Sequence, residues 1–212
     1  MAHVLPYNDL LKIAAGVGIV LDEVADGPAN LYVIVDDQGL DLYVGKAHSE
    51  RRHTNEDRWA DLDHTKEILS GFVALWRENN ASRRRLNYHP AAFDPERVRT
   101  VIAEQKWSGG SVDKLLARLD RGKVPTVEEV EQILIRIHIR AGRLIGNAKD
   151  ASQWESPIGT FYDTMAALAV DTGRVSGVIP SAPAVTTEDP VNKEIDSELR
   201  AEGVHEGDGD DA

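Results

Sequence analysis

The 212-residue chain contains no cysteine, only two methionines and 6% aromatic residues. Without cysteine, a disulfide-stapled secreted domain, a thiolate zinc site and an iron–sulfur cluster are all excluded. The seven histidines do not recur at a metal-ligand spacing. Any bound metal is therefore directed to oxygen ligands, which favours a hard divalent cation.

Long apolar runs are also missing. The longest uncharged apolar stretch near the start, Ile13–Leu21, is broken by Gly16 and Gly18. It is too short to span a bilayer, and no basic signal segment precedes it. We therefore expect a soluble, cytoplasmic protein with no membrane partner.

Basic residues are outnumbered, since 24 Lys and Arg face 36 Asp and Glu and give a formal net charge of −12. This balance argues against a nucleic-acid partner, because phosphate binding uses Lys and Arg. The charge is uneven, however: Val175–Ala212 carries −8 and the rest of the chain −4. The tail also lacks aromatic residues and begins with Ser-Ala-Pro-Ala, which predicts an acidic disordered segment.

Two hypotheses apply to this acidic tail. It is either a solubilising segment or a mimic of DNA that folds back on a basic surface and restrains binding. With the tail set apart, the body is nearly balanced, and the charge objection to DNA weakens.

The clearest local pattern is a β-hairpin. Two runs rich in β-branched and aromatic residues, Asn30–Val35 and Leu40–Val44, flank an acidic loop that ends in Gly39. A third strand is predicted over Val98–Ala103, where apolar and polar residues alternate in part. Together these runs predict a small antiparallel three-stranded sheet.

Helical patterns surround these strands. The strongest begins at Thr126, where Glu129 completes a capping box, and it stops near Gly142. The other predicted helices cover Asp9–Ala15, parts of 48–80, Val112–Leu119 and 150–170.

The predicted fold class is therefore α+β, a hairpin plus one strand flanked by helices. We divide the chain into an N-terminal helical extension (1–29), a main domain (30–149), a C-terminal helix (150–174) and the acidic tail (175–212). The pattern does not specify an oligomeric state.

The hairpin strands carry the most informative motif. They contain Leu31-Tyr32-Val33 and Tyr43-Val44-Gly45, followed at once by Lys46 and then by Arg51-Arg52. Far downstream, Glu131 opens an apolar helical run, and Asn147 follows 16 residues later. In this order the residues resemble the GIY-YIG nuclease family, and Leu42–Ala47 is especially similar to its excision-repair members.

The resemblance implies a metal-dependent DNA endonuclease that cleaves a phosphodiester bond by one-metal hydrolysis. Glu131 would hold Mg²⁺ or Mn²⁺, Arg52 would bind the scissile phosphate, and Tyr43 or Tyr32 would act as general base. Lys46 would bias that ionisation or hold phosphate, Gly45 would allow a close backbone approach, and Asn147 would fix the geometry between sheet and helix. The implied catalytic residues are Tyr32, Tyr43, Lys46, Arg52, Glu131 and Asn147.

Several alternatives stay open at the residue level. Asn30 stands where the family's first triplet usually has glycine, and Arg52 is displaced by one position, so Arg51 or Arg58 are also candidates for its role. Each tyrosine alone is typical of strand packing. Carboxylates that rival the predicted metal ligand are Glu104, Glu128 and Glu129.

Two alternatives also stay open for the whole chain. One is a GIY-YIG-like domain that has lost catalysis and binds nucleic acid or protein. The other is an unrelated α+β interaction protein. For the nuclease hypothesis, a set of basic residues could supply the phosphate contacts that the net charge conceals: Arg83, Arg84, Arg85, Arg97, Arg99, Arg136, Arg140, Arg143 and Lys149.

Overall fold

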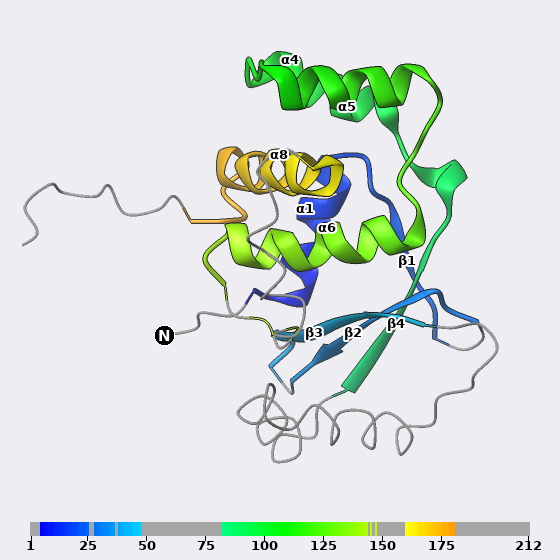
Figure 1. The fold of residues 1–212 in the computed structure, drawn as a ribbon. Helices are drawn as coiled ribbons and strands as arrows, with labels where there is room; N and C mark the ends of the chain where they lie inside the picture. The colour runs from blue at the N-terminus through cyan, green and yellow to red at the C-terminus, as the bar shows by residue number, and fades with distance from the viewer. Residues whose placement is uncertain are drawn as a thin grey trace, which may run out of the picture. The chain divides into compact units, whose positions relative to one another are not determined.

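A computed structural model describes residues 5–25, 28–36, 38–47, 82–143, 145, 147 and 160–180. Four strands form one antiparallel sheet in the order β1-β4-β2-β3 (Figure 1). Their bounds are β1 Leu21–Glu23, β2 Leu31–Val35, β3 Asp41–Lys46 and β4 Ser82–Tyr88. The predicted hairpin is thus confirmed as β2 and β3.

The two faces of the sheet differ. Leu31, Val33 and Val35 of β2 are buried in the hydrophobic core together with Val44 and Leu86. The intervening side chains of β2 point to the opposite face, because successive residues of a strand alternate. One face of the sheet therefore forms the floor of the core.

Five helices pack above that floor. They are α1 Tyr7–Gly16, α4 Pro95–Glu104, α5 Gly110–Asp120, α6 Val127–Arg140 and α8 Phe161–Val175, and a 3₁₀ turn covers Pro90–Ala92. Helix α6 contacts β3, and α8 packs on α6 and α1, while α4 and α5 lie against α8 (Figure 1). Apolar side chains of all five helices share one core with the sheet.

The prediction of three strands was wrong. Val98–Ala103 lies inside α4, where Val98, Val101 and Ile102 are buried at helical spacing. The helix begins at Pro95, and the Asp94 carboxylate accepts hydrogen bonds from the N–H groups of the first turn. This cap and the spacing of three and four residues outweigh the local alternation.

Two strands were missing from the prediction. β4 has the polar sequence Ser-Arg-Arg-Arg-Leu-Asn-Tyr and nevertheless lies between β1 and β2. β1 has only three residues and pairs with β4 from Leu21 to Glu23. Neither segment shows the run of apolar or β-branched residues on which strand prediction depends.

The predicted helices agree with the structure in the described segments. The capping box of Thr126 and Glu129 is present at the start of α6. The helices expected over Asp9–Ala15 and Val112–Leu119 appear as α1 and α5, each slightly longer than expected. α8 covers the second part of the helix expected over 150–170, whereas 150–159 and the helical pattern over 48–80 lie outside the described residues.

The chain divides after Ile179, and the described residues up to that point form a first, compact unit. Within the first unit, α1 and α8 pack on each other and on α6, so segments from both ends share the core of the sheet. In the part of the chain that the structure describes, no helix is long and apolar enough to cross a membrane.

Candidate active site

The site begins at the free edge of the sheet. β3 is an outer strand of the sheet, and among the described residues no strand pairs with the backbone groups on its outer side. The Val44 N–H donates to Asn147 Oδ1 at 3.0 Å, and Asn147 Nδ2 donates back to the Val44 carbonyl oxygen at 2.6 Å. Asn147 thus takes the place of a fifth strand at this position, and its side chain is buried.

Glu131 also bonds the outer edge of β3, two residues further along the strand. The Lys46 N–H donates to Glu131 Oε1 at 2.7 Å. Glu131 lies on α6, in the second turn, so this bond attaches the helix to the strand edge. Three predicted site residues, Lys46, Glu131 and Asn147, therefore meet along β3 although they are far apart in the sequence.

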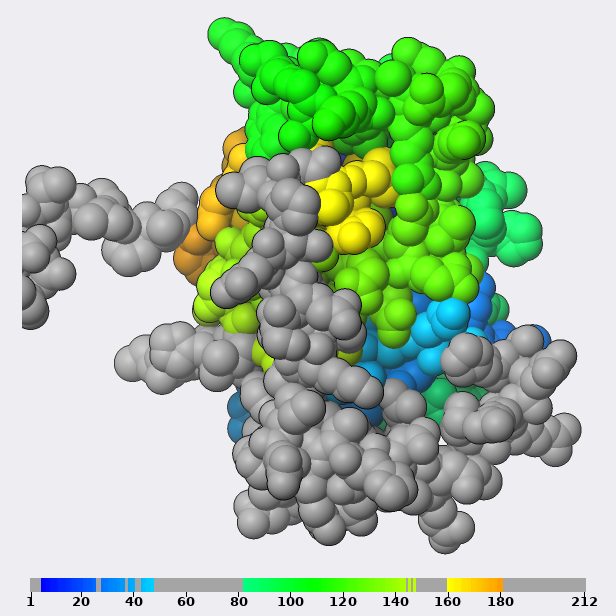
Figure 2. Space-filling view, in the orientation of Figure 1, coloured from blue at the N-terminus to red at the C-terminus, as the bar shows by residue number. Residues whose placement is uncertain are grey.

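The side chain of Lys46 also reaches α6. Its ammonium donates to Glu128 Oε1 at 2.8 Å, one helical turn before Glu131. Figure 2 shows β3, in cyan, directly against the yellow-green surface of α6. The hydrogen bond from Lys46, followed by that from its own backbone N–H, lowers the pKa of Glu128 below its ordinary value.

The two predicted tyrosines lie together on the other face of the sheet. Tyr32 pairs with Gly45 across the hairpin, and Tyr43 pairs with Ile34. The rings of Tyr32 and Tyr43 are stacked, with centroids 6.0 Å apart and an interplanar angle of 16°. The Arg83 guanidinium of β4 lies 4.3 Å from the centre of the Tyr32 ring, a cation–π contact.

Gly45 is explained by this packing. A Cβ atom at position 45 would lie 2.3 Å from Cζ and the hydroxyl oxygen of Tyr32, closer than non-bonded atoms approach. The space that the sequence suggested for a close backbone approach is therefore filled by the Tyr32 ring.

Exposure separates the two tyrosines chemically. Tyr32 is 1% exposed, whereas Tyr43 is partly exposed. A general base must reach the water that it deprotonates. Of the two predicted tyrosines, Tyr43 meets this requirement better than the buried Tyr32 does.

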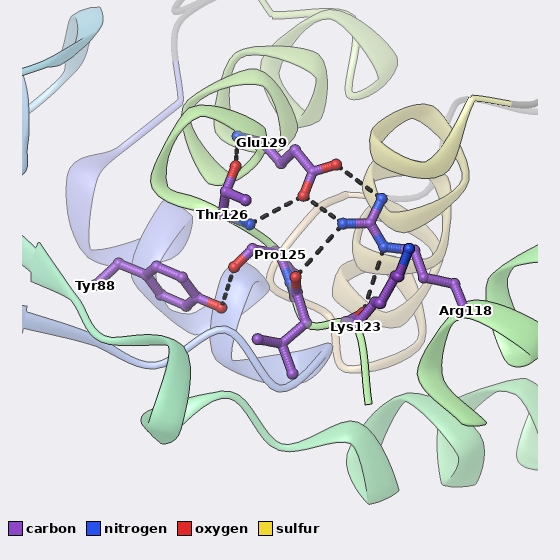
Figure 3. A network of polar contacts seen from close by, with 7 residues as sticks. Tyr88, Arg118, Lys123, Pro125, Thr126 and Glu129 are labelled. Carbon is purple, nitrogen blue, oxygen red and sulfur yellow. Dashed lines mark hydrogen bonds and ion pairs between the residues drawn. The ribbon is translucent and has the colours of Figure 1, made fainter. Parts of the chain in front are cut away.

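A polar network fixes the start of α6 (Figure 3). The same helix carries Glu128 and Glu131. Arg118 of α5 donates through Nη1 to Glu129 Oε1 at 2.7 Å and also contacts Oε2. Its guanidinium stacks 3.7 Å from the ring centre of Phe161 on α8. The Tyr88 hydroxyl of β4 donates to the Pro125 carbonyl oxygen at 3.0 Å. The network thus ties α5, α6, α8 and the sheet together.

The donor set at β3 is compatible with one hard divalent cation. Such ions can be bound by a single carboxylate, with water and substrate phosphate as the remaining ligands. A carboxylate offers about four lone-pair sites, and the Lys46 N–H uses one on Glu131. Among the residues that the structure describes, no group of three or more His, Asp or Glu is arranged as a metal site.

Other candidates are placed elsewhere. Arg51, Arg52 and Arg58 lie outside the described residues. Glu129 belongs to the capping box and to the Arg118 pair. Glu104 lies at the end of α4 and lines a separate cleft of about 550 Å³ between α4 and α8, which none of the predicted catalytic residues lines.

The described basic residues expected to contact phosphate lie on β4, on α4 and within or just after α6. Arg136 is 7% exposed and stacks on Tyr162, and Lys149 lies outside the described residues. Several others are held in ion pairs within the chain: Arg84–Glu23, Arg97–Glu104, Arg99–Asp120 and Arg140–Asp163. Arg83 and Arg85 lie on the tyrosine face, where burial, and then the charge of Arg85, lower the pKa of Arg83.

Two residues named in the sequence have other partners than expected. Glu128 is a rival metal ligand in the sequence, yet in the structure it pairs with Lys46; its spacing of three from Glu131 is the signal that places it beside that residue. The sequence predicts that Arg83 contacts phosphate, and no local pattern indicates that it stacks on Tyr32.

The geometry defines an α+β protein whose four-stranded antiparallel sheet is capped along one edge by a glutamate and an asparagine. In comparisons with protein-family models, curated proteins and solved structures, no match is found. The functional argument therefore depends on the site itself.

Proposed function

We propose that this chain is a metal-dependent DNA endonuclease that hydrolyses a phosphodiester bond. The observation that carries the proposal is the meeting of Lys46, Glu131 and Asn147 at the outer edge of β3. The resemblance selected these residues by their types and order, without information about contacts. The bonded pairs Lys46–Glu131 and Val44–Asn147 are 85 and 103 residues apart in the sequence. An accidental motif match gives no reason for the distal residues to bond the proximal strand.

Each residue has a chemical task in this proposal. Glu131 would hold Mg²⁺ or Mn²⁺, which supplies polarisation of a phosphoryl oxygen and stabilisation of the leaving oxygen. The Lys46 ammonium binds a phosphate oxygen of the substrate. Tyr43, which is partly exposed, would act as general base after losing its own proton to solvent, the resulting phenolate taking the proton of the attacking water. Asn147 acts by position only, because both polar atoms of its amide bond the backbone of Val44.

Glu131→Gln tests the proposal. Glutamine keeps the side-chain oxygen that accepts the Lys46 N–H, so the strand edge is preserved while the negative charge is lost. We expect the wild-type chain to nick supercoiled plasmid with Mg²⁺ or Mn²⁺ and the variant to lose about 10²-fold or more in rate, a typical loss when one group that stabilises the transition state is removed.

Glu104→Gln is the matched control. It also neutralises one glutamate on a helix, but Glu104 is at α4 and away from β3. Its nicking rate should equal that of the wild type. Equal nicking by the Glu131→Gln variant would show contaminating activity and remove the assignment.

One observation favours a second function, a nucleic-acid or protein binding module without catalysis. Lys46 and Glu131 both take part in bonds that hold β3 to α6, and Tyr32 is buried, so three of the predicted catalytic residues have structural tasks. Retained DNA binding with no nicking by the wild-type chain under either metal would support this alternative.

A further inference from the structure

Lys46 is held by two carboxylates of α6 in different ways. Glu131 accepts the backbone N–H of Lys46, a bond that belongs to the capped edge of the sheet. From Lys46, Glu128 accepts the side-chain ammonium, at 2.8 Å, and it also accepts from its own backbone N–H. The Glu128 side chain is 62% exposed and that of Lys46 27% exposed. Glu128 is therefore the more exposed partner, the one that can turn away from the ammonium towards solvent.

The position that Glu128 occupies has the chemistry of a phosphate site. Carboxylate and phosphate oxygens both accept charge-assisted hydrogen bonds from an ammonium at about 2.7–2.9 Å. Lysine binds either anion as a point charge, without the directional demand of arginine. An exposed ion pair is also weak, so a competing anion can replace it.

We propose that the Glu128 carboxylate occupies the position of a DNA phosphate on Lys46, so that substrate binds this cation only by displacing Glu128. This inference rests on the DNA substrate of the proposed function and deepens it. Glu128 sets the affinity of the site for the DNA backbone. The bond between Glu131 and the Lys46 N–H is untouched by the exchange, because it uses another atom of the lysine.

Four variants test the exchange: Glu128→Gln, Lys46→Gln, the double variant, and Glu96→Gln as control. Glu96 is a matched glutamate, since it also forms an exposed ion pair on a helix, with Arg99 of α4. Fluorescence anisotropy with a labelled duplex in EDTA, at several salt concentrations, measures binding without cleavage.

We expect Glu128→Gln to bind the duplex about two- to fivefold more tightly at low salt, as the strength of an exposed pair allows. Its plot of log affinity against log salt should steepen by up to about 0.9, the value for one added phosphate contact. Glu96→Gln should show only a small, general effect of its lost charge. In the Lys46→Gln background, Glu128→Gln should gain no more than the control does.

Three outcomes would overturn the inference: an equal gain from Glu128→Gln and Glu96→Gln, a gain that persists without Lys46, or no duplex binding by any variant. The endonuclease proposal fails separately. If Glu128 and Lys46 show the expected coupling but plasmid is not nicked, the exchange stands and catalysis does not. If plasmid is nicked but Glu128 has no specific effect, the reverse holds.

Discussion

At the scale of single residues, the site depends on small steric facts as much as on charge. Tyr32 is enclosed by the stacked ring of Tyr43, by the Arg83 guanidinium and by the bare Cα of Gly45. Gly45 also lies directly before Lys46, so the ring that packs over it helps to fix the strand that presents the ammonium. The packing of the Tyr32 ring on Gly45 thus supports the strand segment that carries Lys46.

This packing predicts a cost for Gly45→Ala. The new methyl group would meet the Tyr32 ring at 2.3 Å, and that ring is buried between two other groups. We expect the free energy of unfolding to fall by about 1–3 kcal/mol, the usual range for an overpacked core position. Urea unfolding at 25 °C measures the change.

Gly110→Ala is the control, because nothing lies within 4 Å of a Cβ there and the residue starts α5. Alanine in a helix should leave the free energy of unfolding unchanged or raise it by up to about 1 kcal/mol. Equal effects of the two substitutions would show that the contact with Tyr32 is not what requires glycine at position 45.

At the scale of elements, α6 is the part that connects the sheet to the helical layers. Its first turn is held by Arg118 and by the Tyr88 hydroxyl, which donates to the Pro125 carbonyl just before the cap (Figure 3). Its second turn bonds the edge of β3 through Glu131. A displaced helix start would therefore also displace Glu128 and Glu131.

Tyr88→Phe tests this attachment through pH. Burial, and then the charge of Glu129, raise the pKa of Tyr88. A phenol whose pKa is higher in the folded state favours folding below its unfolded pKa of about 10, and this contribution is lost as pH rises above that value. The wild-type free energy of unfolding should therefore decline above about pH 10.

The phenylalanine variant should lose about 1 kcal/mol at pH 7, the worth of the hydrogen bond to Pro125. It should also show a smaller decline above pH 10, because one raised pKa has been removed. Urea unfolding at pH 7, 9 and 10.5 gives both quantities. The same alkaline slope in variant and wild type would contradict a role for the Tyr88 proton.

The elements also show which parts of this fold can be predicted from sequence. The hairpin and the capping box of α6 were predictable, because alternation, turn residues and cap residues act locally. Val98–Ala103 was assigned to a strand because its two periodicities overlap, and only the Asp94-Pro95 cap distinguishes them. β4 was not predictable, since its three arginines become a strand only through pairing with β2.

The same limit applies to the candidate site. The resemblance selected Lys46, Glu131 and Asn147 and implied that Asn147 would fix the geometry between sheet and helix, but it did not imply that Glu131 would bond the backbone of an edge strand. That arrangement follows from where α6 lies on the sheet. The acidic partners of Arg84, Arg99 and Arg140 likewise lie on other elements. The sequence around each arginine therefore does not predict its partner.

At the scale of the whole molecule, charge is distributed very unevenly along the chain. Residues 181–212 carry a net charge of −8, whereas the rest of the chain carries −4. The boundary between them is set by Ile179, which is 2% exposed and whose N–H donates to the Gly173 carbonyl oxygen at 2.9 Å. The compact core therefore extends beyond the end of α8. A chain cut after Pro180 would lose the acidic residues and keep the buried ones.

A chain ending at Pro180 tests whether the tail acts as a mimic of DNA. It loses a net charge of −8 while Ile179 stays in the core. If the tail competes with DNA, the shortened chain should bind duplex DNA severalfold more tightly at low salt. The difference should shrink towards 0.15 M salt, where charges are screened beyond about 8 Å. Anisotropy titrations of both chains measure the difference in affinity. A chain ending at Ser176 is the control, because it also loses Ile179 and should melt at a lower temperature. Comparing the two shortened chains separates the loss of charge from the loss of core packing. Unchanged affinity at low salt would leave the tail as a solubilising segment.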